Sequence, residues 1–163
     1  MMLGPSYFGG QYVAINFAYG VVDIAPLTVH NVPITAGAKA LALAFGFCNT
    51  HDGIKFYPLA TDAPINVGSD SDVETVTPSA VSNNNDSYGG MNFTATFANA
   101  HAEGDPISSA TFGLQEAIDL AQANGGGKVI IDAQWAAAGG TTAIKNAAVF
   151  ASPTIVQILD YRT

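Results

Sequence analysis

The chain has 163 residues, a length typical of one domain with a single hydrophobic core. Only 11% of its residues are charged, less than half of the roughly 25% that is usual in soluble globular domains. Its 13 Asp and Glu exceed its 5 Lys and Arg, and the net charge of -8 argues against direct binding to nucleic acid or to an anionic membrane surface.

The start of the chain lacks the features of an export signal. No Lys or Arg precedes Lys39, and no apolar run is long enough for a leader or a membrane span. We therefore expect synthesis in the cytoplasm without a cleaved leader. The single cysteine, Cys48, excludes an internal disulfide framework.

Residues 1–20 combine five Gly or Pro with five aromatic side chains. One interpretation is an N-terminal arm that docks its aromatic side chains on a neighbouring subunit. The alternative is an ordinary first strand around Tyr12–Phe17 that folds onto its own domain. The first interpretation predicts interface residues at Tyr7, Phe8, Tyr12, Phe17 and Tyr19.

Short strand-like segments follow between Leu27 and Phe97. In residues 39–47, Leu and Phe alternate with small Ala and Gly, which is typical of a strand. The turn at 49–53 contains Asp52-Gly53, a pair favoured in hairpins. Five or six short strands separated by turns predict a small antiparallel β-barrel or sandwich over residues 21–105.

The pattern changes near Asp105-Pro106. Leu114, Ala117, Ile118 and Ala121 have helical spacing, with Thr111 as a candidate N-cap and Asn124-Gly125 as a stop. Residues 128–133 then predict a buried strand and residues 154–161 a final one, with a possible short helix between them. The predicted fold is therefore mainly β, with one amphipathic helix and a short β-α-β-like part over residues 106–163.

One long segment resembles a short β-unit that recurs in structural proteins of tailed bacteriophages. The unit has the form VG, ETVTV, AV, FTATF and HAxGxPV. The matching positions in this chain are Val67-Gly68, Glu74–Thr77, Ala80-Val81, Phe93–Phe97 and His101–Ile107. Pro78 interrupts the pattern where the strand would continue, so we expect a break there.

A second segment, GLQEAIDLAQANGGGKVII within residues 111–131, is similar to the helix, Gly-rich turn and strand that open β-helix proteins such as phage tail spikes. Only 35 residues follow Lys128, enough for at most one or two β-helix rungs of roughly 20 residues. The β-helix itself is therefore not expected. Together the two resemblances imply a protein of the virion, present in many symmetric copies.

Three places in the sequence contain residue types that occur at functional sites. Cys48, His51 and Asp52 contain the residue types of a thiol nucleophile and its base, but a tight hairpin cannot orient them independently, so we expect no catalysis. Asp70, Asp72 and Glu74 alternate and are weak candidates for a metal site, because on a strand they would share one face. Trp135 is an interface candidate, although core filling is the commoner role.

The histidines and the glycine run indicate structural roles. His30, His51 and His101 have no metal-ligand spacing, and turn capping is the simplest role for His101. Gly125–Gly127 follow a helix, so they end it and cannot bind phosphate at its start. We expect no enzyme activity, no cofactor and no metal.

The sequence thus predicts a capsid-associated decoration protein of a tailed phage. It would assemble with copies of itself, expected as a trimer, and with virion proteins such as the major capsid protein. A tail, neck or fibre-base adaptor is the first alternative. A glycan-binding module is an alternative of another class, which would need an aromatic platform or a carboxylate pair.

Overall fold

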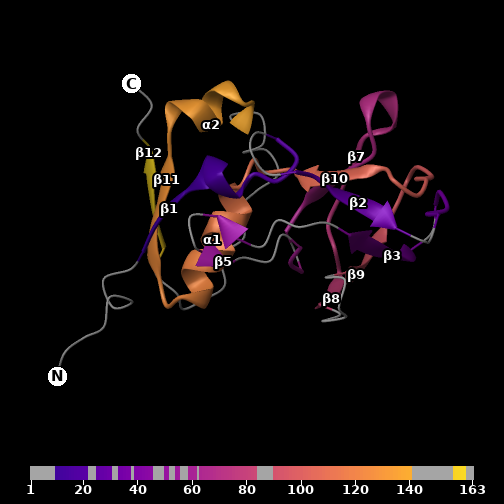
Figure 1. Ribbon diagram of the computed structural model, residues 1–163, viewed down its shortest axis with the longest axis horizontal. Coiled ribbons are helices and arrows are strands. Elements are labelled where there is room, and N and C mark those ends of the chain that lie inside the picture. The colour runs from indigo at the N-terminus through magenta and orange to yellow at the C-terminus, as the bar shows by residue number, and fades with distance from the viewer. Residues whose placement is uncertain are drawn as a thin grey trace.

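A computed structural model describes residues 10–21, 25–30, 33–37, 39–45, 50–51, 54–55, 59–61, 63–83, 90–140 and 156–160. These residues form two halves that lie side by side along the longest axis (Figure 1). One half is an antiparallel sheet, and the other is a helix packed on a smaller parallel sheet. The chain is therefore mainly β, as the sequence predicts.

The first half is a seven-stranded antiparallel sheet in the order β7-β6-β10-β2-β3-β9-β8. A separate two-stranded antiparallel pair, β4 with β5, joins Thr50 to Lys55 and His51 to Ile54, and the predicted Asp52-Gly53 turn lies outside the described residues. The strands are β2 (Leu27–His30), β3 (Lys39–Phe45), β4 (Thr50–His51), β5 (Ile54–Lys55), β6 (Ile65–Val67), β7 (Glu74–Val76), β8 (Ala80–Asn83), β9 (Met91–Thr96) and β10 (Pro106–Ser109).

The seven-stranded sheet is strongly curved. Its two edge strands, β7 and β8, are consecutive in the chain, with only residues 77–79 between them. Three linking residues span at most about 14 Å, whereas the edges of a flat seven-stranded sheet lie about 29 Å apart. The sheet must therefore curl until its edges approach, which gives the barrel-like body that the strand pattern predicts. The predicted break at Pro78 lies in this link.

Large side chains from several strands fill the inside of the curved sheet. Phe93 and Phe97 contact each other edge to face at 6.1 Å between ring centroids, and both are buried. β3 directs Ala42 and Ala44 into this interior, where bulkier side chains would compete with the phenylalanines for space. Leu41, Leu43 and Phe45 therefore lie on the outer face of the sheet.

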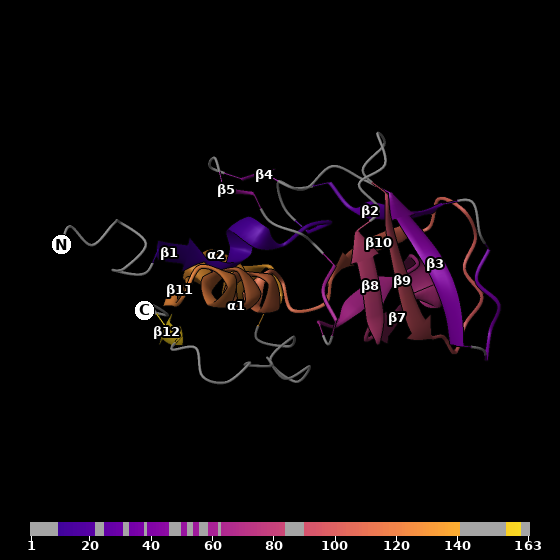
Figure 2. The same cartoon turned by 90° about the horizontal axis from the view of Figure 1, so that it is seen from below.

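The second half is a parallel sheet in the order β1-β11-β12, with β1 (Gly10–Val13), β11 (Gly127–Ile131) and β12 (Val156–Asp160). Helix α1 (Leu114–Ala123) packs on this sheet through Ala117, Ile118 and Ala121, as its spacing predicts (Figure 2). The short helices η2 (Ala14–Phe17) and α2 (Ala133–Ala137) lie beside it, and η3 (Asp70–Asp72) belongs to the first half.

Two glycines shape the ends of α1. Gly113 precedes the helix with a φ of 83°, and a Cβ there would lie 1.9 Å from the carbonyl oxygen of Ala14, so only glycine lets the helix start pack against η2. Gly125 follows the helix with a φ of 83°, the left-handed stop that the sequence predicts. Thr111 caps the helix by a different route, because its Oγ1 accepts from the backbone N–H of Gln115 at 3.0 Å while Gly113 occupies the N-cap position.

The structure corrects two of the predicted boundaries. Residues 10–20 are not a free arm, because β1 pairs in parallel with β11 and η2 packs against α1. The body also does not end at residue 105, because β10 is an inner strand of the sheet, between β6 and β2. β10 was missed because PISS carries only one large apolar side chain, so its pattern did not stand out from a loop.

Candidate functional site

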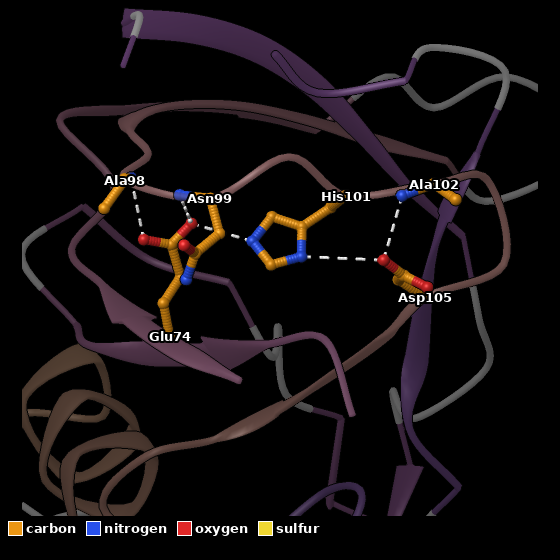
Figure 3. Close-up of polar contacts among 6 residues, drawn as sticks. All are labelled: Glu74, Ala98, Asn99, His101, Ala102 and Asp105. Atoms are coloured by element: carbon orange, nitrogen blue, oxygen red, sulfur yellow. Dashed lines mark hydrogen bonds and ion pairs between the residues drawn. The ribbon is translucent and has the colours of Figure 1, made fainter. Parts of the chain in front are cut away.

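The clearest polar cluster joins Glu74 at the start of β7 to His101 and Asp105 in the loop before β10 (Figure 3). Glu74 Oε1 lies 2.7 Å from His101 Nε2. The same carboxylate accepts from the backbone N–H groups of Ala98 at 2.8 Å and Asn99 at 3.1 Å. On the far side of the ring, Nδ1 lies 3.5 Å from Asp105 Oδ2. The imidazole is thus held between two carboxylates.

Local backbone contacts fix the position of this histidine. His101 and Ile34 exchange both backbone hydrogen bonds, at 2.8 and 3.0 Å, in an isolated antiparallel bridge. Its ring packs edge to face on Phe97 at 5.9 Å between centroids. Gly68, with a φ of 97°, leaves room beside the ring, since a Cβ there would lie 3.1 Å from two of its atoms. The side chain of His101 is consequently 0% exposed.

The donors around Glu74 keep its carboxylate ionised. Burial by itself raises the pKa of Glu74, but the hydrogen bonds from His101, Ala98 and Asn99 outweigh it and hold the pKa below its usual range. An ionised carboxylate only accepts hydrogen bonds, so Nε2 of His101 carries the proton that joins them. Asp105 in turn accepts from the backbone N–H of Ala102 at 2.9 Å, which closes the loop at its base.

This cluster holds structure together and does not form a reaction centre. The ring of His101 has no exposed surface, so no substrate can reach it. The contacts tie the edge strand β7 to the loop of residues 97–105, two segments that share no ladder hydrogen bonds. The Glu74–His101 pair also links β7 to the loop that follows β9. The sequence predicted only turn capping for His101, because nothing in it indicated a partner 27 residues away.

The structure does not bring together Asp70, Asp72 and Glu74, the weak candidates for a metal site. Asp70 and Asp72 lie in the short helix η3 and are exposed, and only Glu74 belongs to a strand, so the three do not share one face. Glu74 is turned toward His101. Within the part of the chain that the structure describes, no three His, Cys, Asp or Glu side chains are placed to hold a metal ion.

A second buried carboxyl, Glu116, lies in the first turn of α1. Its Oε2 accepts from the hydroxyl of Thr111 at 3.2 Å, while Oε1 has no hydrogen-bond partner among the described residues. Burial raises the pKa of Glu116 to about 7, although the hydroxyl groups of Ser109 and Thr111 oppose this shift. The sequence showed no signal for this group, since Glu116 lies in the first helical turn, where acidic residues are usually exposed.

Among the described residues, the outer face of β3 is the most apolar exposed feature. Leu41 is 59% exposed, and Leu43 and Phe45 beside it are half-buried. In register with them lie polar side chains of the neighbouring strands, Thr28, His30, Asn92 and Thr94. No described helix or strand covers this face, and β8, β9 and β3 lie side by side at the surface of the body (Figure 2). Such a stripe matches a surface used in protein packing.

The predicted interface residues lie elsewhere. Tyr12, Phe17, Tyr19 and Trp135 are buried in the core of their own chain, which corrects their assignment as interface residues. Gly10 and Gly127 leave the space that the Tyr12 ring occupies, since a Cβ on either would lie within 2.8 Å of that ring.

Trp135 is fixed in the same core. Its Nε1 donates to the carbonyl oxygen of Thr111 at 3.3 Å. Tyr7, Phe8, Cys48 and Asp52 lie outside the described residues, and His51 is described only as part of strand β4.

Comparisons with known proteins found no match among family models, curated proteins or solved structures. Among the described residues, no helix has the length and apolar character required to cross a bilayer.

Proposed function

We propose that the chain is a structural protein of a tailed-bacteriophage particle, bound to the capsid as a decoration protein. It acts by packing against copies of itself and against other virion proteins such as the major capsid protein, without catalysis and without direct contact to nucleic acid. The observation that carries the proposal is the outer face of β3, where Leu41, Leu43 and Phe45 point away from the core while Ala42 and Ala44 point into it.

This arrangement reverses the usual distribution of large and small apolar side chains. Leaving a leucine in water forgoes about 1.5 to 3 kcal/mol that its burial would contribute. A chain that exposes Leu41 and buries alanines recovers that free energy when another subunit covers the face. The low content of charged residues supports the same role, because weakly charged surfaces lose little hydration when they pack.

The phage-like segment supports the proposal from a second direction. Its residues form β6 to β10, which are five of the seven strands of the curved sheet. In the sheet, β2 and β3 lie between β10 and β9. Glu74 and His101, which belong to the resembling positions, close this unit internally. The β-rich structure of this segment is compatible with the resemblance and supports the proposal to that extent.

A tail, neck or fibre-base adaptor is a second candidate, favoured by the α1–β11 segment. Helix α1, the turn at Gly125 and Gly126, and the parallel strand β11 follow one another as in the opening of β-helix proteins to which this segment is similar. β11 pairs in parallel on both sides, with β1 and β12. A parallel sheet of this kind suits attachment to a longer parallel β structure.

Binding to separated virion parts tests the two candidates. The purified chain is mixed with shells assembled without it and, separately, with isolated tails, and bound protein is measured after sedimentation. Saturable binding to shells at a fixed number of copies, displaced by excess unlabelled chain, supports the decoration role. Binding to tails alone supports the adaptor role, and binding to neither overturns both.

A further inference from the structure

The outer face of strands β2, β3 and β9, called here the β3 face, is suited to a second copy of the same chain. Its centre is the apolar stripe of β3, with Leu41 the most exposed large apolar residue described. The flanking strands contribute hydroxyl, amide and imidazole side chains in register with the stripe: Thr28 and His30 from β2, and Asn92, Thr94 and Thr96 from β9. These side chains form a polar rim around an apolar centre, the usual anatomy of an interface.

The charge distribution favours a copy of this chain as the occupant. The chain carries a net charge of -8, so two copies repel each other across most surfaces. The outward positions of β2, β3 and β9 hold no carboxylate, and their one ammonium group is that of Lys39. Two copies therefore approach through this face with less repulsion than surfaces bearing the acidic residues would impose.

Groups of opposite charge lie on the two sides of Leu41. Lys39 is exposed at the first residue of β3. On the other side, the carboxylate of Glu103 lies 3.4 Å from Nδ1 of His30, which is in register with Leu43. Glu103 is 59% exposed, so its carboxylate is available to a partner. Lys39 and Leu43 are four residues apart on β3, about 14 Å.

A two-fold axis near Leu41 makes this pattern self-complementary. It sets the β3 strands of two copies antiparallel, so that Lys39 of each copy lies opposite Glu103 of the other. We propose that the chain forms a two-fold dimer through the β3 face, with Leu41 at its centre and a Lys39–Glu103 ion pair at each end. The proposal deepens the proposed packing function and rests on it for its biological role. It replaces the trimer expected from the sequence by a pair.

The size of the purified chain and of two matched variants tests the apolar centre. Sedimentation equilibrium of the wild-type chain should give a dimer. Leu41→Asp should raise the dissociation constant on the order of 100-fold, because it buries an unpaired carboxylate at the centre of the contact. Val73→Asp is the control, since Val73 is 44% exposed and lies outside the face, and it should leave the dimer intact. Circular dichroism and urea unfolding verify that both variants fold.

A charge exchange tests the two-fold arrangement. Lys39→Glu and Glu103→Lys should each raise the dissociation constant by about three- to tenfold at low salt, and the double variant should return it to within about twofold of the wild-type value. A wild-type monomer, a trimer, a Leu41→Asp variant that still dimerises, or a double variant weaker than both singles would overturn the inference.

The shell-binding measurement keeps the two proposals separate. A dimer that binds neither shells nor tails leaves the β3-face contact standing and removes the virion role. A monomer that binds shells supports the virion role and removes the β3-face dimer.

Discussion

Glu74 in the curved sheet and Glu116 on α1 are both largely buried, but the two halves of the molecule surround them differently. Glu74 receives hydrogen bonds from two backbone N–H groups and from His101, and its pKa is lowered. Glu116 receives a hydroxyl group at Oε2 and has an unpartnered Oε1 among the described residues, and burial raises its pKa to about 7. The number and kind of donors decide the protonation state, in agreement with the general causes of pKa shifts.

Because of this difference, the stability of the two halves should depend on pH in opposite ways. The curved sheet is tied together by a charged contact that is complete at neutral pH. The helix half instead contains a carboxyl that is best accommodated in its protonated form. Acid should therefore weaken the first half through Glu74, and alkali should weaken the second through Glu116.

The replacement His101→Ala should have the largest effect on stability, because it removes the partner of Glu74 in the curved sheet. It leaves Glu74 without its side-chain partner and opens a cavity beside Phe97, so the free energy of unfolding should fall by about 4 kcal/mol. Urea unfolding at neutral pH measures the loss. The matched control is His30→Ala, whose exposed pair with Glu103 should change the free energy by less than about 0.5 kcal/mol. Equal effects of the two replacements would contradict the proposal that His101 holds β7 and the loop of residues 97–105 together.

The predicted fold and the structure agree where local patterns are strong. The spacing of Leu114, Ala117 and Ile118 predicts α1, and the alternation in residues 39–45 predicts β3, because one buried face imposes a period. The parallel pairing of β1 with β11 could not be predicted, because it joins residues more than 110 positions apart and depends on Gly10 and Gly127 making room for Tyr12. That pairing also explains why the aromatic residues of the supposed arm are buried.

The candidate sites were harder to predict than the fold. His101 and Glu74 are far apart in sequence and meet only because the sheet curls, so spacing could not indicate their contact. The sequence also did not indicate which face of β3 points toward the core. Alternation showed that one face is large and the other small, but only the crowding by Phe93 and Phe97 decides that the small face points inward.

The replacement Glu116→Gln should remove the alkaline weakness of the helix half. Because the folded pKa of about 7 lies above the ordinary glutamate value of 4.5, the contribution of this carboxyl to stability is complete below pH 4.5 and is lost as the pH rises through 7. The shift corresponds to at most about 3 kcal/mol. Unfolding free energies between about pH 4 and pH 9 should therefore fall for the wild-type chain and stay flatter for the variant.

Asp72→Asn is the control for this titration, since Asp72 is exposed in η3 and lies outside the β3 face, and its replacement should change the free energy of unfolding by less than about 0.5 kcal/mol and leave the slope unchanged. A Glu116→Gln variant with the same alkaline slope as the wild-type chain would show that another group is responsible. Asp119, whose pKa burial also raises, would be the next residue to replace.

The smallest expected effect belongs to Glu74→Gln, which tests the curved sheet from the acid side. The pKa of Glu74 is lowered in the folded chain, so its contribution is present above pH 4.5 and is lost as the pH falls through the folded value. The glutamine carbonyl still accepts from the backbone N–H groups, so the variant should lose only about 1 to 2 kcal/mol at neutral pH. Its unfolding free energy should also decline less than that of the wild-type chain on acidification. A variant with an unchanged acid decline would mean that the charge of Glu74 does not stabilise the sheet, and that His101 holds the loop mainly by packing on Phe97.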